Sequence, residues 1–293
     1  MGFSTGIFYS ILFFMKKIAV ITGASSGIGA EFARQVARNY KYDEIWLIAR
    51  REEKLREVAA AATVSKKTLV RPVVMDVSGK EGALVFGAFL KKEAAENGTE
   101  GLEIGLLINN AGFGTYGPFE ETSLARQMEM IELNCTTVTG ICGYALPFMH
   151  KGSVIINTAS LAGFMPLGNF AVYAASKAYT LNFTVALAAE LRDKGIKVCA
   201  LCPGSVSSEF ANVASNGARK EVKGGFPPEK VVAQCLRRAF RGKTISLYRP
   251  KWKFNAFLSH IVGRYTVARF TYLHNKRPRT PDADAPINSG LQI

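Results

Sequence analysis

The sequence contains few residues of the kinds that bind metals or form cross-links. Among 293 residues there are three histidines and five cysteines. Two of the cysteines form a C-x-x-C pair at Cys199 and Cys202, but this pair ends a strand-like run, whereas a redox pair is expected to open a helix. We predict no metal site and interpret all five, which lie in apolar stretches, as core thiols of a reducing compartment: Cys135, Cys142, Cys199, Cys202 and Cys235.

The sequence also lacks a hydrophobic run long enough to cross a bilayer. Residues 1–15 contain an apolar run of about ten residues, and a transmembrane helix needs about 20. No basic stretch precedes this run and no small-residue cleavage site follows it, so it does not fit a secretory signal. We predict a cytoplasmic protein in which either 1–15 is an apolar N-terminal extension or the natural start is Met15, and we favour Met15.

Acidic residues are missing from the end of the chain. Thirteen of the 37 lysines and arginines lie between Lys230 and Pro281, where there is no aspartate or glutamate. Apolar residues recur at 254, 257, 258, 261, 262, 265 and 268, which predicts one amphipathic helix with a basic rim. Three fates remain open for this tail, residues 250–293: packing on its own domain or a sister subunit, peripheral contact with an anionic membrane through 250–275, or capping a substrate pocket. Because no recognition module is present, nucleic acid is not an expected partner.

Residues 16–249 alternate between short apolar runs and longer helical patterns, which predicts one α/β domain. Because the apolar runs do not alternate with polar residues, their strands are expected to be buried on both faces, as in a Rossmann-type doubly wound parallel sheet. The expected strands are 17–22, 44–49, 68–75, 103–109, 153–159, 196–202 and 244–248. The expected helices are 27–40, 52–62, 80–97, 119–149, 171–194 and 228–241.

The stretch TGASSGIG, residues 22–29, follows the first expected strand and opens the first helix. Glycines at 23, 27 and 29 allow a tight turn and a close approach to a ligand, and the free N–H groups of the helix start face an anion. The stretch therefore predicts a site for the pyrophosphate of a dinucleotide, formed by Gly23, Ser25, Ser26, Gly27, Ile28 and Gly29.

The end of the second strand bears on the choice of cofactor. It reads Ala49, Arg50, Arg51, without the acidic residue that would bind the ribose diol of NAD. A guanidinium suits a 2′-phosphate, so we predict NADP(H), with Arg50 as the main contact and Arg51 as the second. The alternative is that both arginines are solvated charges at a helix start.

Further cofactor contacts are expected where the later strands end. Asp76 either accepts a hydrogen bond from the adenine or caps a helix, and Asn109 is expected to tie neighbouring strands together. The other expected contacts are Val77, Asn110, Ala111, Gly112, Pro203, Gly204 and Val206.

Tyr173 and Lys177 lie four residues apart in VYAASKAY, and therefore on one helix face. A phenol with a pKa of about 10 is a poor base near neutral pH, and a cation about 4 Å away contributes roughly 4 kcal/mol at an effective dielectric near 20. We expect Lys177 to lower the Tyr173 pKa, so that the phenol exchanges protons with a carbonyl oxygen. Ser160, at the end of a strand, is expected to position that oxygen.

Together these segments resemble the short-chain dehydrogenase/reductase family. TGASSGIG, NNAG, the Asn of ELNCTT, the Ser ending INTAS, YAASK and PGSV occur in the family's order and spacing, from about Lys16 to Tyr248. The resemblance implies a seven-stranded sheet, a homodimer or homotetramer packed through 119–149 and 171–194, and a tetrad of Asn134, Ser160, Tyr173 and Lys177. In that tetrad Asn134 would hold a water, and Lys177 would also bind the nicotinamide ribose. ARREEKL and NNAGFGTYGPF look like the branch that includes bacterial hydroxysteroid dehydrogenase-like carbonyl reductases.

We therefore predict NADP(H)-dependent interconversion of a lipophilic ketone and a secondary alcohol. The alternatives are a nucleotide-binding regulator without turnover, against which the intact tetrad argues, and a membrane-associated scaffold. The small, polar stretch 207–225 predicts either a mobile lid or a structural loop. Apolar residues expected at the crevice mouth favour a hydroxysteroid, an aromatic ketone or a fatty-acyl compound: Phe113, Tyr116, Leu161, Phe164, Met165, Leu167 and Phe170.

Overall fold

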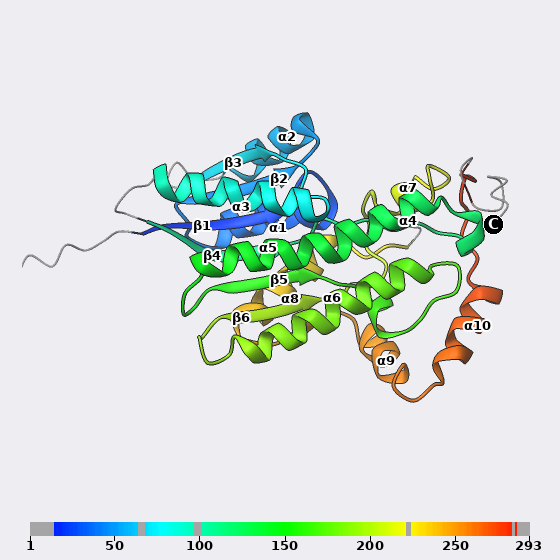
Figure 1. Cartoon of the computed structure of the whole chain (residues 1–293). Coiled ribbons are helices and arrows are strands. Elements are labelled where there is room, and N and C mark those ends of the chain that lie inside the picture. Colours follow the sequence, from blue (N-terminus) through cyan, green and yellow to red (C-terminus); the bar gives the residue numbers. More distant parts are fainter. Residues whose placement is uncertain (1–14, 64–67, 97–100, 221–223, 283–284, 286–293) are drawn as a thin grey trace, which may run out of the picture.

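The structure is a computed structural model that describes residues 15–63, 68–96, 101–220, 224–282 and 285 (Figure 1). The expected N-terminal extension therefore lies outside the described residues, apart from Met15. Within the described ranges no helix combines the length and apolarity that a membrane crossing requires.

Seven parallel strands form a single sheet in the order β3-β2-β1-β4-β5-β6-β7, which confirms the predicted fold class. The strands are β1 (Lys16–Thr22), β2 (Glu44–Ala49), β3 (Leu69–Val74), β4 (Leu102–Asn109), β5 (Val154–Thr158), β6 (Lys197–Leu201) and β7 (Ile245–Ser246). The strand order reverses between β1 and β4, and in such sheets ligands bind beyond the carboxyl ends of the strands at this point.

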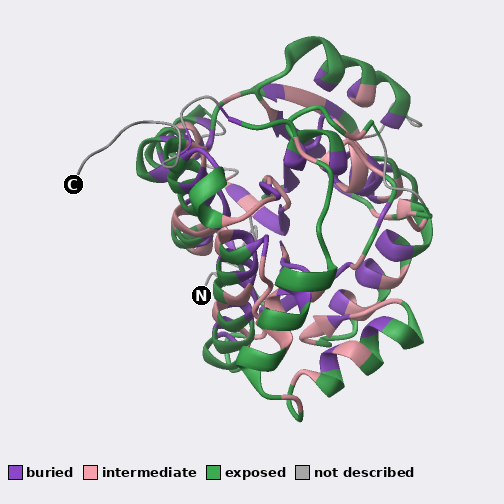
Figure 2. Cartoon of the chain, turned by 90° about the vertical axis from the view of Figure 1, so that its right-hand side faces the viewer, coloured by how far each residue is buried: buried purple, intermediate pink, exposed green. Residues whose placement is uncertain are grey.

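Helices cover both faces of the sheet, and the side chains of β1 show why. Ala19 and Ile21 pack toward α1 (Gly27–Asn39), α2 (Glu52–Ala62) and α8 (Pro228–Phe240), whereas Ile18 and Val20 pack toward α3 (Gly79–Glu96), α5 (Thr137–Ala145) and α6 (Ala171–Glu190). All four of these side chains are fully buried. The central strands are accordingly mostly buried, and the outer helices are mostly exposed (Figure 2).

Two expected helices differ from the structure. The expected helix 119–149 consists of a 3-10 turn, α4 (Leu124–Ile131), a π-helical turn (Glu132–Thr136), α5 and a second 3-10 turn. The prediction of one amphipathic tail helix is wrong, because the tail forms α9 (Pro250–Leu258) and α10 (Arg264–His274). Gly263 precedes α10 and ends the intervening turn, and glycine is a poor residue for a helix interior.

The segments beyond the carboxyl ends of the strands lie at one end of the molecule. In Figure 1, α4, α7 (Phe210–Ala214), α9 and α10 gather at the right-hand end. Short α7 forms within the stretch predicted as a lid or loop. Helices α4, α7 and α9, with the carboxyl ends of the strands, contribute residues to the large cavity described next.

Candidate active site

One continuous cavity of about 1560 Å³ runs along the carboxyl ends of the strands. Pockets for a single drug-sized ligand usually measure roughly 300–1,000 Å³, so this one has room for a dinucleotide together with a substrate. Its lining includes most of the residues predicted as cofactor contacts, among them Gly23, Arg50, Asp76 and Val206, together with Ser160, Tyr173 and Lys177.

The glycine turn leaves no space for side chains beneath the start of α1. A Cβ on Gly23 would come within 2.8 Å of the Ala111 Cα, and a Cβ on Gly29 within 2.2 Å of the Gly23 carbonyl oxygen. Gly23 and Gly27 also have φ values of 62° and 55°, which favour glycine. Backbone N–H groups at the start of α1 are thereby presented to the cavity, and this arrangement fits the pyrophosphate of a dinucleotide.

Two arginines follow β2 in different environments. Arg50 is largely exposed, and its guanidinium lies 3.6 Å from the Asp76 carboxylate. Arg51 donates to the Ser25 and Ser26 hydroxyls at 3.0 and 2.9 Å and pairs with Glu209 at 2.7 Å. Glu209 also pairs with Lys54, and the hydrogen bonds to these cations lower the pKa of Glu209 to about 2. The segment before α7 is thus tied by charge to the start of α2.

The turn residues after β3 and β4 have structural partners. Asp76 accepts a hydrogen bond from the Ser78 N–H at 2.9 Å, as in the capping alternative. The Asn110 side chain donates to the carbonyls of Thr22 and Gly23, both at 3.2 Å, and so joins β4 to the glycine turn. Asn109 donates to the Asn157 side chain at 2.9 Å, and ties β4 to β5 as expected.

Tyr173, Lys177 and Ser160 converge on the cavity from α6 and the end of β5. They are only 7%, 5% and 8% exposed. The Lys177 ammonium lies 5.8 Å from the centre of the Tyr173 ring and donates to the Thr158 carbonyl at 2.8 Å. The two i, i+4 side chains therefore share a face of the helix, and the ammonium is held against the end of β5.

Burial controls the protonation of this pair. Desolvation raises the pKa of Tyr173 to about 12, against a smaller lowering by its hydrogen bond with Ser160. Desolvation lowers the pKa of Lys177 to about 8. The prediction that Lys177 lowers the Tyr173 pKa is therefore wrong for the protein without cofactor. Burial destabilises the phenolate by more than the neighbouring positive charges stabilise it.

Asn134 lies in the π-helical turn between α4 and α5. Its side-chain amide donates to the Phe113 carbonyl at 2.9 Å and to the Ser176 hydroxyl at 3.0 Å, and its carbonyl oxygen accepts from the Phe113 N–H. Local π-helical geometry is frequent at functional sites because it redirects a side chain. Here it directs Asn134 toward the Phe113 backbone, so that the turn after β4 is fixed to α6.

An aromatic wall forms the substrate end of the cavity. Phe170 stacks on the Tyr173 ring with centroids 4.1 Å apart, and Tyr116 lies 4.8 Å from Phe170. Six of the seven expected mouth residues line the cavity, namely Phe113, Tyr116, Leu161, Met165, Leu167 and Phe170, whereas Phe164 does not. Phe164 instead packs beside the core cluster that contains Leu181.

The tail completes this end of the cavity, with contributions that no motif in the sequence indicated. The Arg277 guanidinium lies 4.7 Å from the centre of the Tyr116 ring and 5.1 Å from that of Phe170. Trp252 of α9 packs so tightly on the turn after β6 that a Cβ on Gly204 would approach its ring within 2.5 Å. Of the three fates considered for the tail, capping the pocket therefore has direct geometric support.

The segment Gly23 to Gly27 also matches the G-x-S-x-G pattern of serine hydrolases. Its central Ser25 accepts hydrogen bonds from Arg51, and none of the three histidines, His150, His260 and His274, lines the cavity. A nucleophilic serine needs a nearby base, so the pattern carries no hydrolase site here.

The comparisons with known proteins agree with this geometry. The short chain dehydrogenase family matches residues 17–218. Very-long-chain 3-oxoacyl-CoA reductase-B of Danio rerio is 33% identical over 262 residues, which cover 87% of this chain and 76% of the relative.

Two solved structures are similar in fold. A short-chain dehydrogenase from Sphingobium yanoikuyae in complex with NADPH has a TM-score of 0.69 and 25% identity, covering 84% of this chain and 94% of the other. A short chain dehydrogenase/reductase from Burkholderia phymatum in complex with NAD has a TM-score of 0.72 and 23% identity, covering 92% and 98%. The family match spans the glycine turn, the aromatic wall and Ser160, Tyr173 and Lys177, and we conclude that this chain belongs to the short-chain dehydrogenase family of oxidoreductases.

Proposed function

We propose that the protein is an NADP(H)-dependent reductase that interconverts a ketone on an apolar molecule with the corresponding secondary alcohol. One observation carries the proposal: a single cavity joins the glycine turn at one end to Ser160, Tyr173 and Lys177 at the other. When bound, the nicotinamide supplies the hydride that reduces the carbonyl carbon. The protein must then stabilise and protonate the carbonyl oxygen.

Tyr173 is the proton donor in this scheme. Because burial raises its pKa to about 12, the phenol remains protonated near neutral pH and donates its proton as the oxygen gains charge. The Ser160 hydroxyl, which lies close enough to the phenol to lower its pKa, holds the same oxygen in place. Lys177 lies close enough to the Tyr173 ring to stabilise negative charge when its ammonium is protonated.

The proposed cofactor preference rests on the charges after β2. Arg50 and Arg51 both line the cavity, and Arg50 is the more exposed and the less tightly bound of the two. A 2′-phosphate is expected to bind Arg50 by charge-assisted hydrogen bonds. We expect Arg50→Asp to lower the ratio of NADPH to NADH efficiency by at least tenfold, since such bonds contribute about 1.5–3 kcal/mol.

The substrate class favoured is a 3-oxoacyl thioester. The Danio rerio relative is named for such substrates, and the rim of this cavity is suited to an anionic carrier. Arg277 lies over Tyr116 and Phe170, and Arg126 lies 5.0 Å from the Phe113 ring. Neither guanidinium forms an ion pair with a residue in the described ranges. A coenzyme A or carrier-protein thioester brings phosphate to such a rim, and a neutral steroid does not, so a hydroxysteroid is the second candidate.

Oxidation of NADPH with a panel of 3-oxoacyl-CoA esters, ketosteroids and aromatic ketones tests the proposal. We expect turnover with 3-oxoacyl-CoA and a loss of roughly 10²–10⁴-fold in Tyr173→Phe, because the proton donor is removed. Absence of turnover across the panel, with NADPH still bound, would favour a non-catalytic regulator or scaffold.

A variant pair separates the substrate classes. Arg277→Gln is expected to raise KM roughly tenfold or more for a CoA thioester and to leave KM unchanged for the same acyl group on a neutral thiol. Lys276→Gln is the matched control, because Lys276 is exposed and lies outside the main cavity. An equal effect of Arg277→Gln on both thioesters would contradict recognition of the anionic carrier.

A further inference from the structure

Exposed apolar side chains are concentrated on α9, α10 and the turn between them. The largest exposures are those of Phe254 (61%), Phe257 (61%), Ile261 (66%) and Tyr265 (80%), and Leu258, Phe270 and Leu273 are exposed as well. A helix that packs on its own domain buries its apolar residues. Here most of the apolar residues that recur in the tail sequence face away from the domain. Packing on the domain therefore does not explain why these positions are apolar.

Other residues attach these helices to the domain. Trp252 and Ala256, one turn apart on α9, are buried. On α10 the Thr271 hydroxyl accepts from the Gly168 N–H at 2.8 Å, and Asn169 donates to the Tyr272 carbonyl at 2.8 Å. The two helices are thus held in place without using the exposed apolar residues, which form what we call the tail face: Phe254, Phe257, Leu258, Ile261, Tyr265, Phe270 and Leu273.

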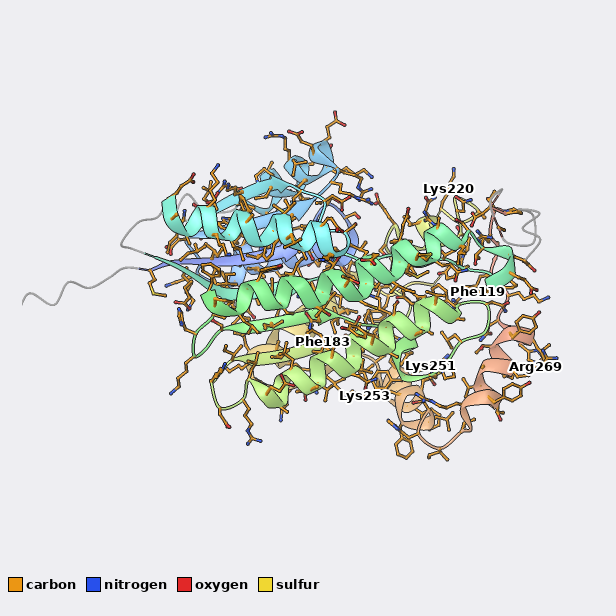
Figure 3. All side chains as sticks on the ribbon, viewed as in Figure 1. Phe119, Phe183, Lys220, Lys251, Lys253 and Arg269 are labelled. Carbon is orange, nitrogen blue, oxygen red and sulfur yellow. The ribbon has the colours of Figure 1, made fainter. Side chains whose placement is uncertain are left out.

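Basic side chains, which we call the basic rim, lie on the same two helices as the tail face and just after them. Lys251 and Lys253 on α9 and Arg269 on α10 are exposed (Figure 3), as are Arg264 and Lys276. None of them forms an ion pair with another described residue, and no acidic residue occurs between Lys230 and Pro281. These five side chains therefore carry positive charge that no ion pair with another described residue neutralises.

We propose that the tail face docks on an anionic lipid bilayer, with the apolar side chains entering the headgroup region and the basic rim contacting lipid phosphates and carboxylates. Apolar residues on one side with lysine and arginine around them are the features that bind helices to such surfaces. Each basic residue near an anionic membrane adds to binding until salt screens it.

A second copy of this chain fits the tail face less well. A two-fold interface would place the patch against itself, and the basic rims of the two copies would then repel each other. Single-stranded nucleic acid would complement the charge and stack on the aromatic rings, but it offers no apolar phase for Leu258, Ile261 and Leu273.

Docking would also bring the substrate entrance to the membrane. Lys251, Trp252 and Asn255 of α9 line the active-site cavity, and so does Arg277 just after α10. Helix α9 thus carries part of the tail face and also contributes residues to the cavity wall, whereas the contribution near α10 comes from Arg277, just beyond that helix. If the proposed function holds, the acyl chain of a thioester substrate held at the bilayer surface would then reach the cavity without crossing water.

Flotation of the full chain with vesicles of phosphatidylcholine, with and without phosphatidylserine, tests the proposal. Because residues 7–14 also form an apolar run, the comparison between full-length variants is decisive. We expect binding to be stronger with phosphatidylserine and to fall as salt is raised. Phe257→Ser and Ile261→Ser are each expected to weaken binding roughly tenfold, and Lys253→Gln roughly fivefold, the equivalent of about 1 kcal/mol.

Matched controls lie on α3, away from the tail face. Val85→Ser removes an apolar side chain of similar exposure, and Lys91→Gln removes an exposed lysine; both are expected to bind as wild type does. Equal binding by wild type and the tail-face variants would overturn the proposal. So would a change of mass in solution in those variants, which would indicate a second copy, or displacement from vesicles by a single-stranded oligonucleotide.

Discussion

Replacing Lys177 with methionine should abolish turnover while making the folded protein more stable near neutral pH. Burial lowers the pKa of Lys177 from 10.5 to about 8, and each pKa unit corresponds to about 1.36 kcal/mol. The folded state therefore loses about 3 kcal/mol at pH 7 by keeping this ammonium protonated. Methionine has a similar volume and no charge, so it avoids this cost.

Part of the gain is offset by a lost hydrogen bond. The Lys177 ammonium donates to the Thr158 carbonyl at 2.8 Å, and losing such a bond costs about 1 kcal/mol. We therefore expect Lys177→Met to raise the free energy of unfolding by about 2 kcal/mol at pH 7.

The sign of this effect depends on pH. In the unfolded chain Lys177 stays protonated up to about pH 10.5, and in the folded chain only up to about pH 8. Between these values the unfolded state binds more protons, so the stability of the wild type rises with pH relative to the variant. The advantage of Lys177→Met is thus full below pH 8 and is expected to vanish or reverse above about pH 10.

Urea denaturation without nucleotide at pH 7 and pH 10 measures both effects. Lys197→Met is the matched control, because the Lys197 ammonium also donates to a backbone carbonyl, that of Phe240, at 2.8 Å but from a half-buried position. We expect this control to lose stability at both pH values. A variant at Lys177 that is less stable than wild type at pH 7, or whose difference does not change with pH, would refute the reasoning.

Three further outcomes are expected from the contacts around the cavity. Glu209→Gln should release Arg51 and Lys54 from their ion pairs, and fluorescence titrations should then show a larger gain in affinity for NADPH than for NADH. Equal changes in the two affinities would count against this. Gly168→Ala places a Cβ 2.5 Å from that of Tyr272, and should lower the free energy of unfolding by about 1–3 kcal/mol and speed proteolysis near α10. Gly143→Ala, with open space at its Cβ, should do neither. Met128→Glu charges an exposed apolar position on α4, on the helices through which we propose dimer or tetramer assembly, and should reduce the mass seen by light scattering; an unchanged mass would place the interface elsewhere.

Much of the fold follows from local properties of the sequence. The strands around Ile21, Leu47 and Ile108 are apolar throughout because both faces of a parallel sheet are covered. The turn around Gly23 and Gly27 can be predicted from the sequence because only glycine adopts its backbone angles readily. The face shared by Tyr173 and Lys177 follows from helical periodicity, which depends only on their spacing.

Tertiary structure alone decided the features that depend on distant parts of the chain. The pKa of Tyr173 rises because residues from several elements exclude water from its ring, and no local pattern reports that burial. Arg277 contacts the aromatic wall about a hundred residues away in sequence, and Glu209, just before α7, pairs with Arg51 at the start of α2. The exposure of Phe257 and Ile261 could not be predicted from the sequence either. Periodicity shows which residues share a face, and only packing shows whether that face is covered.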